Sequence, residues 1–285
     1  MADVSVVVVT YNALPWLERC LGSVRGYETI VVDHGSTDGT LELVRERFPE
    51  VRVIEQGNVG YGGGLNAGFR VSSARYYLPI NSDAWVVDDA VERMVAFADE
   101  RPDVAVVCPR LRNPDGTLQR SVRGFPTPWR VATEYFFLRK LAPRSSALNS
   151  YYAGGFDHDE ARQIEWAMGP CFLVRREAAD TVGLFDESFF MFWEETDWLY
   201  RFDRAGWQTW FLPEAEVVHV GGATHGGRMF GENVKALVGF FEKHHGSREA
   251  ARVRRLLRSA LAVRGVIFPG ERGRMYREAA RSLRP

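Results

Sequence analysis

Short β-branched runs alternate with helical patterns over the first hundred residues, and this alternation constrains the fold more than any other feature. Apolar residues keep helical spacing from Trp16 to Val24, and Pro15 suits a first helical turn. Strands that alternate with helices predict βαβ units around a mostly parallel sheet. The expected strands are 4–10, 29–33, 51–55, 76–80 and 104–108.

The second part of the chain departs from this alternation. Asn-Pro-Asp-Gly supplies turn chemistry between two extended runs, so residues 110–120 are expected to form a hairpin. Asp88 is expected to cap a helix that ends before Pro102. The other expected elements are an irregular segment at 121–165, a buried strand at 166–176, a helix that begins within 194–198, and extended pieces around 207–212 and 215–220. We expect one α/β domain over 1–228 and a basic helical extension over 229–285.

Composition excludes several classes of protein. With 46% hydrophobic and 26% charged residues the chain is globular, and a net charge of −1 supplies no general field for nucleic acid. No run of about 18 uncharged apolar residues suggests a membrane span. Three widely spaced cysteines in apolar runs favour buried thiols and a cytoplasmic, reducing location.

The even balance of charge hides an asymmetry. From Lys243 onward there are twelve basic and three acidic residues, a net charge of +9, against −10 for residues 1–242. Arginines interleave with leucine, valine and isoleucine there, and an amphipathic cationic helix can lie on anionic lipid at the inner face of the membrane. The alternatives are a basic face packed on the acidic body and a dimer contact. No feature of the sequence indicates the oligomeric state.

Three polar segments follow expected strands, where a doubly wound sheet presents its ligand-binding edge. Asp33 ends the second strand, in VVDHGSTDGT (31–40), and can accept hydrogen bonds from a base or ribose. The segment GNVGYGGGLNAGFR (57–70) is rich in glycine, which lets backbone amides approach phosphate. Asp83, in YYLPINSDAWVV (76–87), can hold Mg²⁺ or Mn²⁺ against a diphosphate. Each segment can also be an ordinary turn or helix cap.

Two further candidates lie later in the chain. In FFMFWEETDWLYRFDRAGW (189–207) acidic residues stand among aromatic ones, and burial there raises the pKa of a carboxyl group toward the range useful for proton abstraction. The alternative is an acidic helix N-terminus favoured by the helix dipole. In EVVHVGGATHGG (216–227), His219 ends an apolar run and His225 follows in a glycine-rich loop. Such a histidine is more often a core residue than a metal ligand. The presence of Asp83 as a second candidate ligand favours the metal-binding role.

Seven segments of the sequence, five of them within those described above, occur in an order that resembles glycosyltransferase family 2, especially its rhamnosyltransferase-like and galactofuranosyltransferase-like branches. They are VVVTYN, VVDHGSTDGT, NVGYGGGLNAG, LPINSDA, GPCFLVRREAADTVGLFDESFF, WEETDW and HVGG, and they cover roughly residues 4–225. The resemblance implies a GT-A fold, in which helices flank a Rossmann-like, mostly parallel sheet with an antiparallel acceptor-side portion. It also implies a nucleoside diphosphate sugar donor, a divalent metal (Mg²⁺ or Mn²⁺) and inversion at the anomeric carbon. The sugar, such as rhamnose or another hexose, would move to a hydroxyl of a glycan or lipid-linked acceptor.

The resemblance implies roles for individual residues. Glu195 stands where the family has its catalytic base, and Asp83 and His219 stand where it has metal ligands. The residues implied to bind the nucleotide sugar are Thr10, Tyr11, Asn12, Asp33, Gly35, Asn66, Gly68, Asn81 and Ser82. The residues implied to shape the acceptor or sugar pocket are Trp166, Gly169, Glu194, Asp197 and Trp198.

The chain also departs from the family pattern. Asn81 replaces the first acid of the Asp-x-Asp motif, Glu195 replaces a commoner aspartate, and His34 replaces a commoner asparagine. The Q-x-x-R-W motif of processive synthases is missing, which favours a single transfer. The aromatic segment 129–152 is expected to help choose the acceptor.

Other functions fit the sequence less well. A nucleotide-dependent oxidoreductase needs a glycine fingerprint in the first βα turn, where this chain has TYNALP. Nucleotidyltransferases of the same fold carry a glycine-rich N-terminal signature and a lysine that are missing here. A sugar-nucleotide-binding protein without turnover would lose Glu195 or His219, and both are present.

Overall fold

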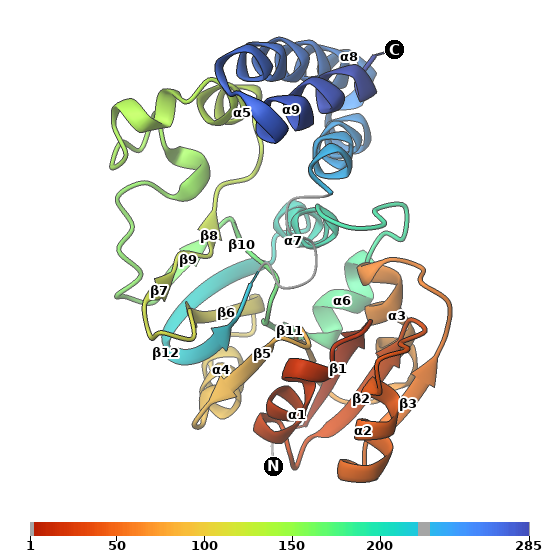
Figure 1. Cartoon of the computed structure of the whole chain (residues 1–285). Coiled ribbons are helices and arrows are strands. Elements are labelled where there is room, and N and C mark those ends of the chain that lie inside the picture. Colours follow the sequence, from red (N-terminus) through yellow and green to blue (C-terminus); the bar gives the residue numbers. More distant parts are fainter. Residues whose placement is uncertain (1–2, 222–228, 285) are drawn as a thin grey trace. The chain divides into compact units, whose positions relative to one another are not determined.

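The protein was analysed as a computed structural model, which describes residues 3–221 and 229–284 and divides into two compact units (Figure 1). The first unit contains residues 1–122, 158–190 and 194–223, and the second contains 123–157, 191–193 and 224–285. Residues 123–157, expected in the first domain, thus belong to the same compact unit as the C-terminal helices. The expected domain boundary at residue 228 stays a prediction.

A mixed, mostly parallel sheet forms the first unit, in the order β3-β2-β1-β4-β11-β6-β12-β5, with β7 paired to β6 and β9 to β12. The strands are β1 (Val4–Thr10), β2 (Glu28–Asp33), β3 (Arg52–Glu55), β4 (Tyr76–Pro79), β5 (Ala84–Val87), β6 (Val104–Arg112), β7 (Leu118–Gln119), β9 (Arg162–Ile164), β11 (Leu173–Arg175) and β12 (Gln208–His219). Two short strands, β8 (Val122–Arg123) and β10 (Trp166–Ala167), lie outside this sheet. The α/β fold expected from the sequence is confirmed.

Helices cover both faces of the sheet. They are α1 (Leu14–Ser23), α2 (Thr40–Arg47), α3 (Tyr61–Val71), α4 (Ala90–Asp99), α6 (Arg176–Val182) and α7 (Glu194–Arg204). Alternate residues of β1 point to opposite faces, as the period of a strand requires. Val6 and Val8 join Leu17 of α1 and Met94 of α4 in one core. On the other face Phe69 of α3 stacks on Trp198 of α7, with ring centroids 5.9 Å apart.

The second unit is helical. It contains α5 (Pro128–Tyr135), the 3₁₀ helices η1 (Leu138–Leu141) and η2 (Ser150–Tyr152), α8 (Phe230–Ile267) and α9 (Gly270–Ser282). Gly246 interrupts α8 with φ 81° and ψ 168°, so this long helix consists of two helices joined at a kink. Buried Arg264 ties α8 to the end of α5 by donating hydrogen bonds to the carbonyl oxygens of Glu134 and Tyr135. The C-terminal helices expected from the sequence are confirmed, and their expected status as a separate domain stays a prediction.

Several local expectations need correction. The fourth helix has Asp89 rather than Asp88 at its N-cap, and Asp88 has φ 49° in the preceding turn. The segment 166–176 is not one strand: β10 and β11 are separated by a turn, and α6 begins at Arg176. The pieces around 207–212 and 215–220 form one strand, β12, whose register shifts between Leu212 and Glu216. In the segment expected to be irregular, Thr127 caps α5 by accepting a hydrogen bond from the Arg130 amide.

Candidate active site

The strand order places a topological switch point beside β1. From β1 the chain continues to β2 and β3 on one side of the sheet, whereas β4 lies on the other side. Ligands of doubly wound sheets bind at the carboxyl edge of the strands, next to such a point. The segments Thr10–Asn12, Asp33–Ser36 and Asn81–Asp83 follow β1, β2 and β4, so the structure brings three of the expected segments to one edge.

Asp33 fixes the loops at this edge. Its carboxylate accepts hydrogen bonds from the Thr10 hydroxyl (2.9 Å) and from the amides of Gly35 (2.9 Å) and Ser36 (2.8 Å), and the residue is only 1% exposed. Gly35 turns the chain with φ 85°, which a residue with a Cβ rarely adopts. The side chain of Asp33 is therefore occupied in holding its own loop, and a contact with nucleoside stays a prediction.

The β1–α1 loop is held in the same way, because Asn12 Oδ1 accepts a hydrogen bond from the Thr37 amide at 2.8 Å. Tyr11 is half exposed at the end of β1. Its ring is thus available for an apolar contact with a ligand, in contrast to the buried Thr10.

The glycine-rich segment has a packing role. A Cβ on Gly60 would lie 2.3 Å from the carbonyl oxygen of Phe190, and one on Gly68 would lie 2.4 Å from Val7 Cγ1. At the start of α3 the Tyr61 amide donates to that same Phe190 oxygen, at 3.1 Å. These glycines therefore let α3 lie close to β1 and to the chain at Phe190. Gly68 remains a predicted ligand contact only through the resemblance.

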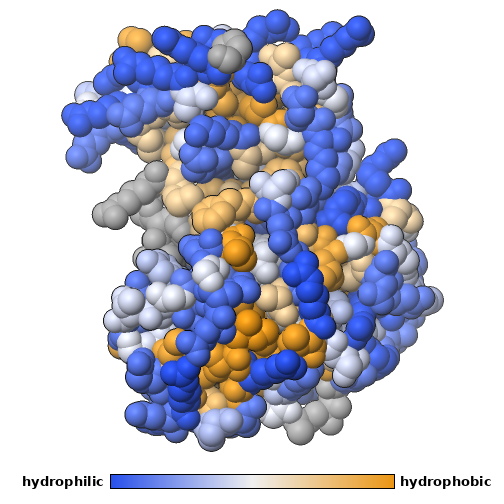
Figure 2. Space-filling view, turned by 90° about the vertical axis from the view of Figure 1, so that its right-hand side faces the viewer, coloured by the Kyte–Doolittle hydropathy of each residue, from blue (hydrophilic) through white to orange (hydrophobic). Residues whose placement is uncertain are grey.

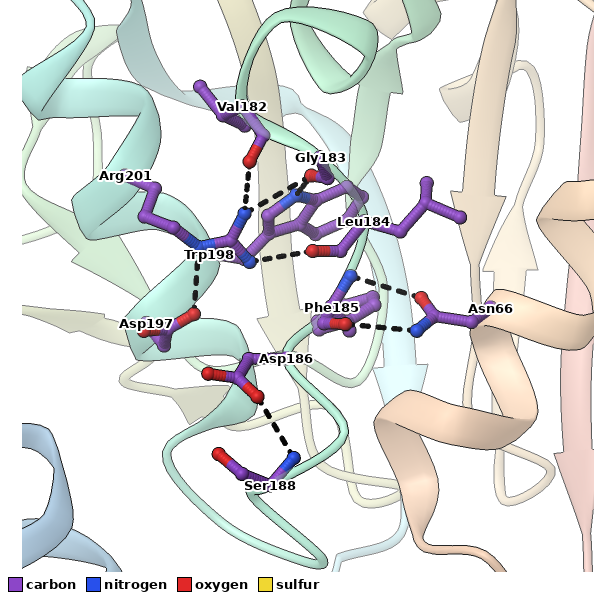
Figure 3. Close-up of polar contacts among 10 residues, drawn as sticks. All are labelled: Asn66, Val182, Gly183, Leu184, Phe185, Asp186, Ser188, Asp197, Trp198 and Arg201. Carbon is purple, nitrogen blue, oxygen red and sulfur yellow. Dashed lines mark hydrogen bonds and ion pairs between the residues drawn. The ribbon is translucent and has the colours of Figure 1, made fainter. Parts of the chain in front are cut away.

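Asn66 is also engaged within the protein. Its amide accepts a hydrogen bond from the Phe185 amide (3.0 Å) and donates to the Phe185 carbonyl (2.9 Å), as Figure 3 shows. With 1% exposure, it joins α3 to the loop before α7. This arrangement favours a structural role, and the expected ribose or diphosphate contact stays untested.

Asp83 and His219 meet at the edge although 136 residues separate them. Antiparallel pairing of β5 with β12 sets His219 opposite Ala84, and the Val220 amide donates to the Asp83 carbonyl at 3.0 Å. His219 Nε2 consequently lies 3.4 Å from Asp83 Oδ1 and 3.4 Å from Asn81 Nδ2. Both Asp83 and His219 are buried. Half-buried Ser82 lies between Asn81 and Asp83 in the chain.

Gln119 orients the imidazole of His219. The Gln119 Nε2 donates to Asn113 Oδ1 at 2.9 Å, so its Oε1 faces His219 Nδ1, 2.8 Å away. The imidazole therefore carries a proton on Nδ1 and directs Nε2 toward Asp83. A metal-binding histidine characteristically donates its other N–H to a fixed acceptor.

The pair fits a divalent cation that also binds substrate. Two ligand atoms about 2.1 Å from one cation are roughly 3.0–3.4 Å apart in common geometries, which agrees with the 3.4 Å separation. Within 3–221 and 229–284, no three His, Cys, Asp or Glu side chains gather into a metal site. Mg²⁺ and similar ions often take one or two protein ligands and complete their coordination with phosphate and water. A bound diphosphate would supply the further ligand oxygens that Asp83 and His219 do not provide.

Two carboxyl groups begin α7. Glu194 is 5% exposed, and Oε2 of both Glu194 and the half-buried Glu195 is shielded from solvent without a hydrogen-bond partner. Burial raises the pKa of Glu194 well above its ordinary value, and the charge of Glu195 raises it further. Burial likewise raises the pKa of Glu195, although backbone hydrogen bonds oppose this effect. An unpartnered carboxyl oxygen with a raised pKa is suited to accept a proton from a bound ligand.

Tyr61 contacts the Asp83 region and is influenced by the charges of the acidic pair, and sequence reasoning missed it. Its hydroxyl donates to Asn81 Oδ1 at 2.7 Å. Burial raises the pKa of Tyr61 well above 10, with further contributions from the charges of Glu194, Glu195 and Asp83. Tyr61 therefore lies among the acids expected to act. Tyr61 lies within the glycine-rich segment, where no pattern of its own marks it as functional. No sequence pattern marks Gln119 either.

Asp197 and Trp198 belong to the core of α7 (Figure 3). Asp197 is 0% exposed and pairs with Arg201 at 2.8 Å, while Arg201 also donates to the carbonyls of Val182 and Leu184. Trp198 is 0% exposed, and its indole donates to the Gly183 carbonyl at 2.8 Å. Their surroundings favour support of α7 over direct ligand contact, and their expected place in the pocket stays a prediction.

Gly169 does lie beside the acidic pair. Its Cβ, if it had one, would be 3.4 Å from Glu195 Cγ, so the chain at Gly169 contacts the side chain of the expected base. Trp166, three residues earlier, is buried at 5% exposure. The strand that carries Trp166, β10, contacts α7.

The second unit contains a cavity of its own, of about 370 Å³. Six of its thirteen lining residues are aromatic, among them Tyr135, Tyr152, Trp193 and Phe230. Phe192 and Trp193 both have positive φ, 69° and 72°, which is uncommon for residues with a Cβ and often marks functional segments. These two strained residues directly precede Glu194 in the chain.

Comparison with known proteins gives the family. Residues 5–183 match the family model described as glycosyl transferase family 2. The chain belongs to this family. It is 33% identical over 237 residues to the N-acetylglucosaminyl-diphospho-decaprenol L-rhamnosyltransferase of Mycobacterium tuberculosis, which covers 77% of this chain and 76% of that protein. It is 24% identical to the low-salt glycan biosynthesis hexosyltransferase Agl10 of Haloferax volcanii, over 71% of this chain and 62% of that protein.

Solved structures confirm the GT-A fold of this glycosyltransferase. The mannosyltransferase PcManGT from Pyrobaculum calidifontis, in complex with GDP-Man and Mn²⁺, matches with a TM-score of 0.59 and 16% identity over 99% of this chain and 84% of that chain. S. aureus TarS 1-349 in complex with UDP-GlcNAc matches with a TM-score of 0.55 and 18% identity over 98% and 79%. No helix in the described part of the chain is long and apolar enough to cross a membrane.

Proposed function

We propose that this glycosyltransferase is a metal-dependent, inverting enzyme that transfers one sugar from a nucleoside diphosphate to an acceptor hydroxyl. The observation that carries the proposal is the position of buried Tyr61, which donates to Asn81 beside the Asp83–His219 pair and whose pKa is raised by the charges of Glu194 and Glu195. This supports a proton acceptor and an oxygen- and nitrogen-lined cation site near the same tyrosine. Together they would serve displacement of a diphosphate by a hydroxyl.

The chemistry of the reaction gives each group a separate role. A divalent cation held by Asp83 and His219 would neutralise charge on the leaving diphosphate. Glu195 would accept the proton of the acceptor hydroxyl as its oxygen attacks the anomeric carbon from the face opposite the phosphate. One displacement inverts the stereocentre, and no covalent intermediate on the protein is required. The raised pKa of Glu195 makes it a stronger base than an ordinary glutamate once it is ionised.

The neighbours of Glu195 would support this role. Ionisation of one carboxyl group disfavours ionisation of the other. The charge of Glu195 raises the pKa of Glu194, so Glu194 would keep its proton while Glu195 acts as the base. Tyr61 donates a hydrogen bond to the side-chain oxygen of Asn81, and the side-chain oxygen of Gln119 accepts one from His219. These two contacts would position the residues on the donor side before the substrate binds.

For the substrates we propose a deoxyhexose donor, such as a rhamnose nucleotide, and a lipid-linked glycan acceptor in cell-envelope synthesis. The similarity to the L-rhamnosyltransferase, at 33% identity over most of both chains, supports this choice. The aromatic cavity of the second unit supports a role of that unit in acceptor binding, because amphipathic rings bind both sugar faces and apolar chains. Three buried, unpaired cysteines support a cytoplasmic place of action.

Calorimetric titration would test the nucleotide and metal parts of the proposal. The protein would be titrated with UDP, dTDP and GDP, each with and without Mn²⁺, and the series repeated with Asp83→Ala. We expect one nucleotide to bind in a metal-dependent manner and the variant to lose this dependence. Absence of nucleotide binding under every condition would refute the proposal that the protein uses a nucleotide-sugar donor.

Turnover separates an enzyme from a binding protein of the same fold. Glu195→Gln keeps the shape of the side chain but removes its basicity. We expect it to bind nucleotide like the wild type and to lower kcat by a factor of about 10²–10⁴. An active Glu195→Gln variant would exclude Glu195 as the base, and an inactive wild type with bound nucleotide would favour the non-catalytic alternative.

A further inference from the structure

The second unit presents a cleft lined with arginine. It has a volume of about 440 Å³ and lies between α8 and α9. Its charged lining residues are Arg255, Arg258, Arg281 and Arg284, and the small residues Ser259, Ala262 and Ala280 complete it. Four positive groups and no carboxylate therefore share one concave surface.

These arginines lack partners in the described part of the chain. Some other exposed arginines are paired: Arg252 contacts Glu249 at 2.9 Å, and Arg47 contacts Glu18 at 2.9 Å. No side-chain hydrogen bond or ion pair joins any of the four cleft arginines to another described residue. Guanidinium groups so close together repel one another, and the repulsion falls when an anion binds between them. The planar fork of arginine suits phosphate oxygens in particular.

Exposed aliphatic side chains continue the same surface. Arg255, Ser259, Ala262 and Val266 are spaced by four, three and four residues, so they lie on one face of α8. Val266 is 85% exposed, and its neighbours Val263 and Ile267 are 48% and 59% exposed. In Figure 2 the upper part of the surface shows hydrophobic side chains among hydrophilic ones. Exposed aliphatic residues thus lie at the end of a basic cleft.

We propose that this surface binds an anionic phospholipid membrane, with lipid phosphates in the arginine cleft and the α8 aliphatic residues at the acyl boundary. A soluble phosphate ligand or nucleic acid would account for the arginines but not for the exposed valine and isoleucine side chains. A bilayer surface accounts for both, since its phosphate layer lies directly above its apolar layer. The proposal concerns the second unit alone and does not depend on the transferase chemistry.

Vesicle co-sedimentation of the full chain tests the proposal. Vesicles of phosphatidylcholine would be compared with vesicles of phosphatidylcholine and phosphatidylglycerol, at low and high salt and without nucleotide or sugar. We expect binding to the anionic vesicles only, weakened by salt because exposed charges are screened. Equal binding to both kinds of vesicle, or to neither, would overturn the proposal.

Two sets of variants separate the charge from the aliphatic contribution. Arg258→Gln with Arg281→Gln should weaken vesicle binding about 25-fold, at about fivefold for each arginine near the surface. Arg25→Gln with Arg47→Gln removes the same charge from the first unit and should leave binding unchanged. Val266→Ser, at a largely exposed position, should weaken binding by up to about tenfold. Equal losses in both arginine pairs would show a general charge effect and refute a specific cleft.

Competition distinguishes the alternative ligands. Inorganic diphosphate and a duplex oligonucleotide would each be added to the vesicle assay at the same charge concentration. Retention of vesicle binding supports the membrane surface. Displacement by diphosphate at low concentration, without an effect of Val266→Ser, would identify a soluble phosphate site, and preferential displacement by the duplex would identify a nucleic-acid site.

Discussion

The contact between α3 and β1 gives a sharp prediction for Gly68→Ala. A Cβ at this position would lie 2.4 Å from Val7 Cγ1 and 2.9 Å from Val7 Cγ2, whereas carbon atoms in contact prefer about 3.5–4.0 Å. Val7 cannot withdraw, because it is 0% exposed on a strand paired on both sides. The helix must therefore move by about an ångström against its own hydrogen bonds to Phe185.

Two opposing effects set the magnitude. Overpacking in a core costs about 1–3 kcal/mol, and replacing a helical glycine by alanine recovers up to about 1 kcal/mol. Because the clash is severe, we expect a net loss of about 2 kcal/mol in the free energy of unfolding. With a urea dependence of about 2 kcal/mol per molar, the midpoint of unfolding should fall by about 1 M.

Gly22→Ala is the matched control. It also changes a helical glycine of the first unit, but its Cβ would meet no atom within 4 Å. We expect this variant to gain about 0.5–1 kcal/mol. Urea unfolding followed by tryptophan fluorescence measures both variants. If Gly68→Ala were as stable as Gly22→Ala but lost nucleotide binding, Gly68 would serve the ligand and not the packing of α3.

Three further predictions follow from the polar contacts of the site. Gln119→Leu removes the acceptor of the His219 Nδ1–H and should weaken Mn²⁺ binding, measured by calorimetry with nucleotide, about 10–100-fold; undiminished affinity would mean that other contacts orient His219. The kcat/KM of transfer should fall as pH drops through the raised pKa of Glu195, so an acidic limb at the pKa of an ordinary glutamate would contradict the burial argument. Glu194→Gln should stabilise the protein, and more so as pH rises, by at most about 1.4 kcal/mol per pH unit. The folded-state pKa of Glu194 lies above the unfolded value, so its contribution to stability is present at low pH and is lost as pH rises through the folded-state pKa; melting temperatures that differ equally at pH 5 and pH 8 would refute this.

Much of the first unit could be predicted from local patterns. The early strands begin and end within a residue or two of expectation up to Pro79, because burial of continuous apolar runs is a property of the sequence itself. The hairpin after β6 was predictable for a similar reason, since Asn113 to Gly116 carry their own turn chemistry. The helix at Glu194 followed from its acidic first turn.

Long-range pairing could not be predicted in this way. Nothing near Asp83 indicates that β5 pairs antiparallel with a strand 130 residues later, yet this register is what brings His219 to it. The missed helix α5 has a different cause: Thr127 and Pro128 form a good helix start, but several prolines in the segment suggested an irregular loop. The glycines of α3 suggested a phosphate site, whereas their close contacts with Val7 and Phe190 show packing.

The direction of β11 has a consequence for how substrate preference can change. This strand runs antiparallel to β4 and β6, so the chain enters it at the edge where it leaves its neighbours. The edge beside Glu195 is therefore reached by the segment that precedes β11, including Gly169, while the other side of the edge is formed by loops that follow β1, β2 and β4. The two sides are encoded in separate stretches of the gene. Under the proposed function, exchange of residues 166–172 between relatives would alter the side beside Glu195 and leave the other intact, so recombination would be expected to change the acceptor and keep the donor.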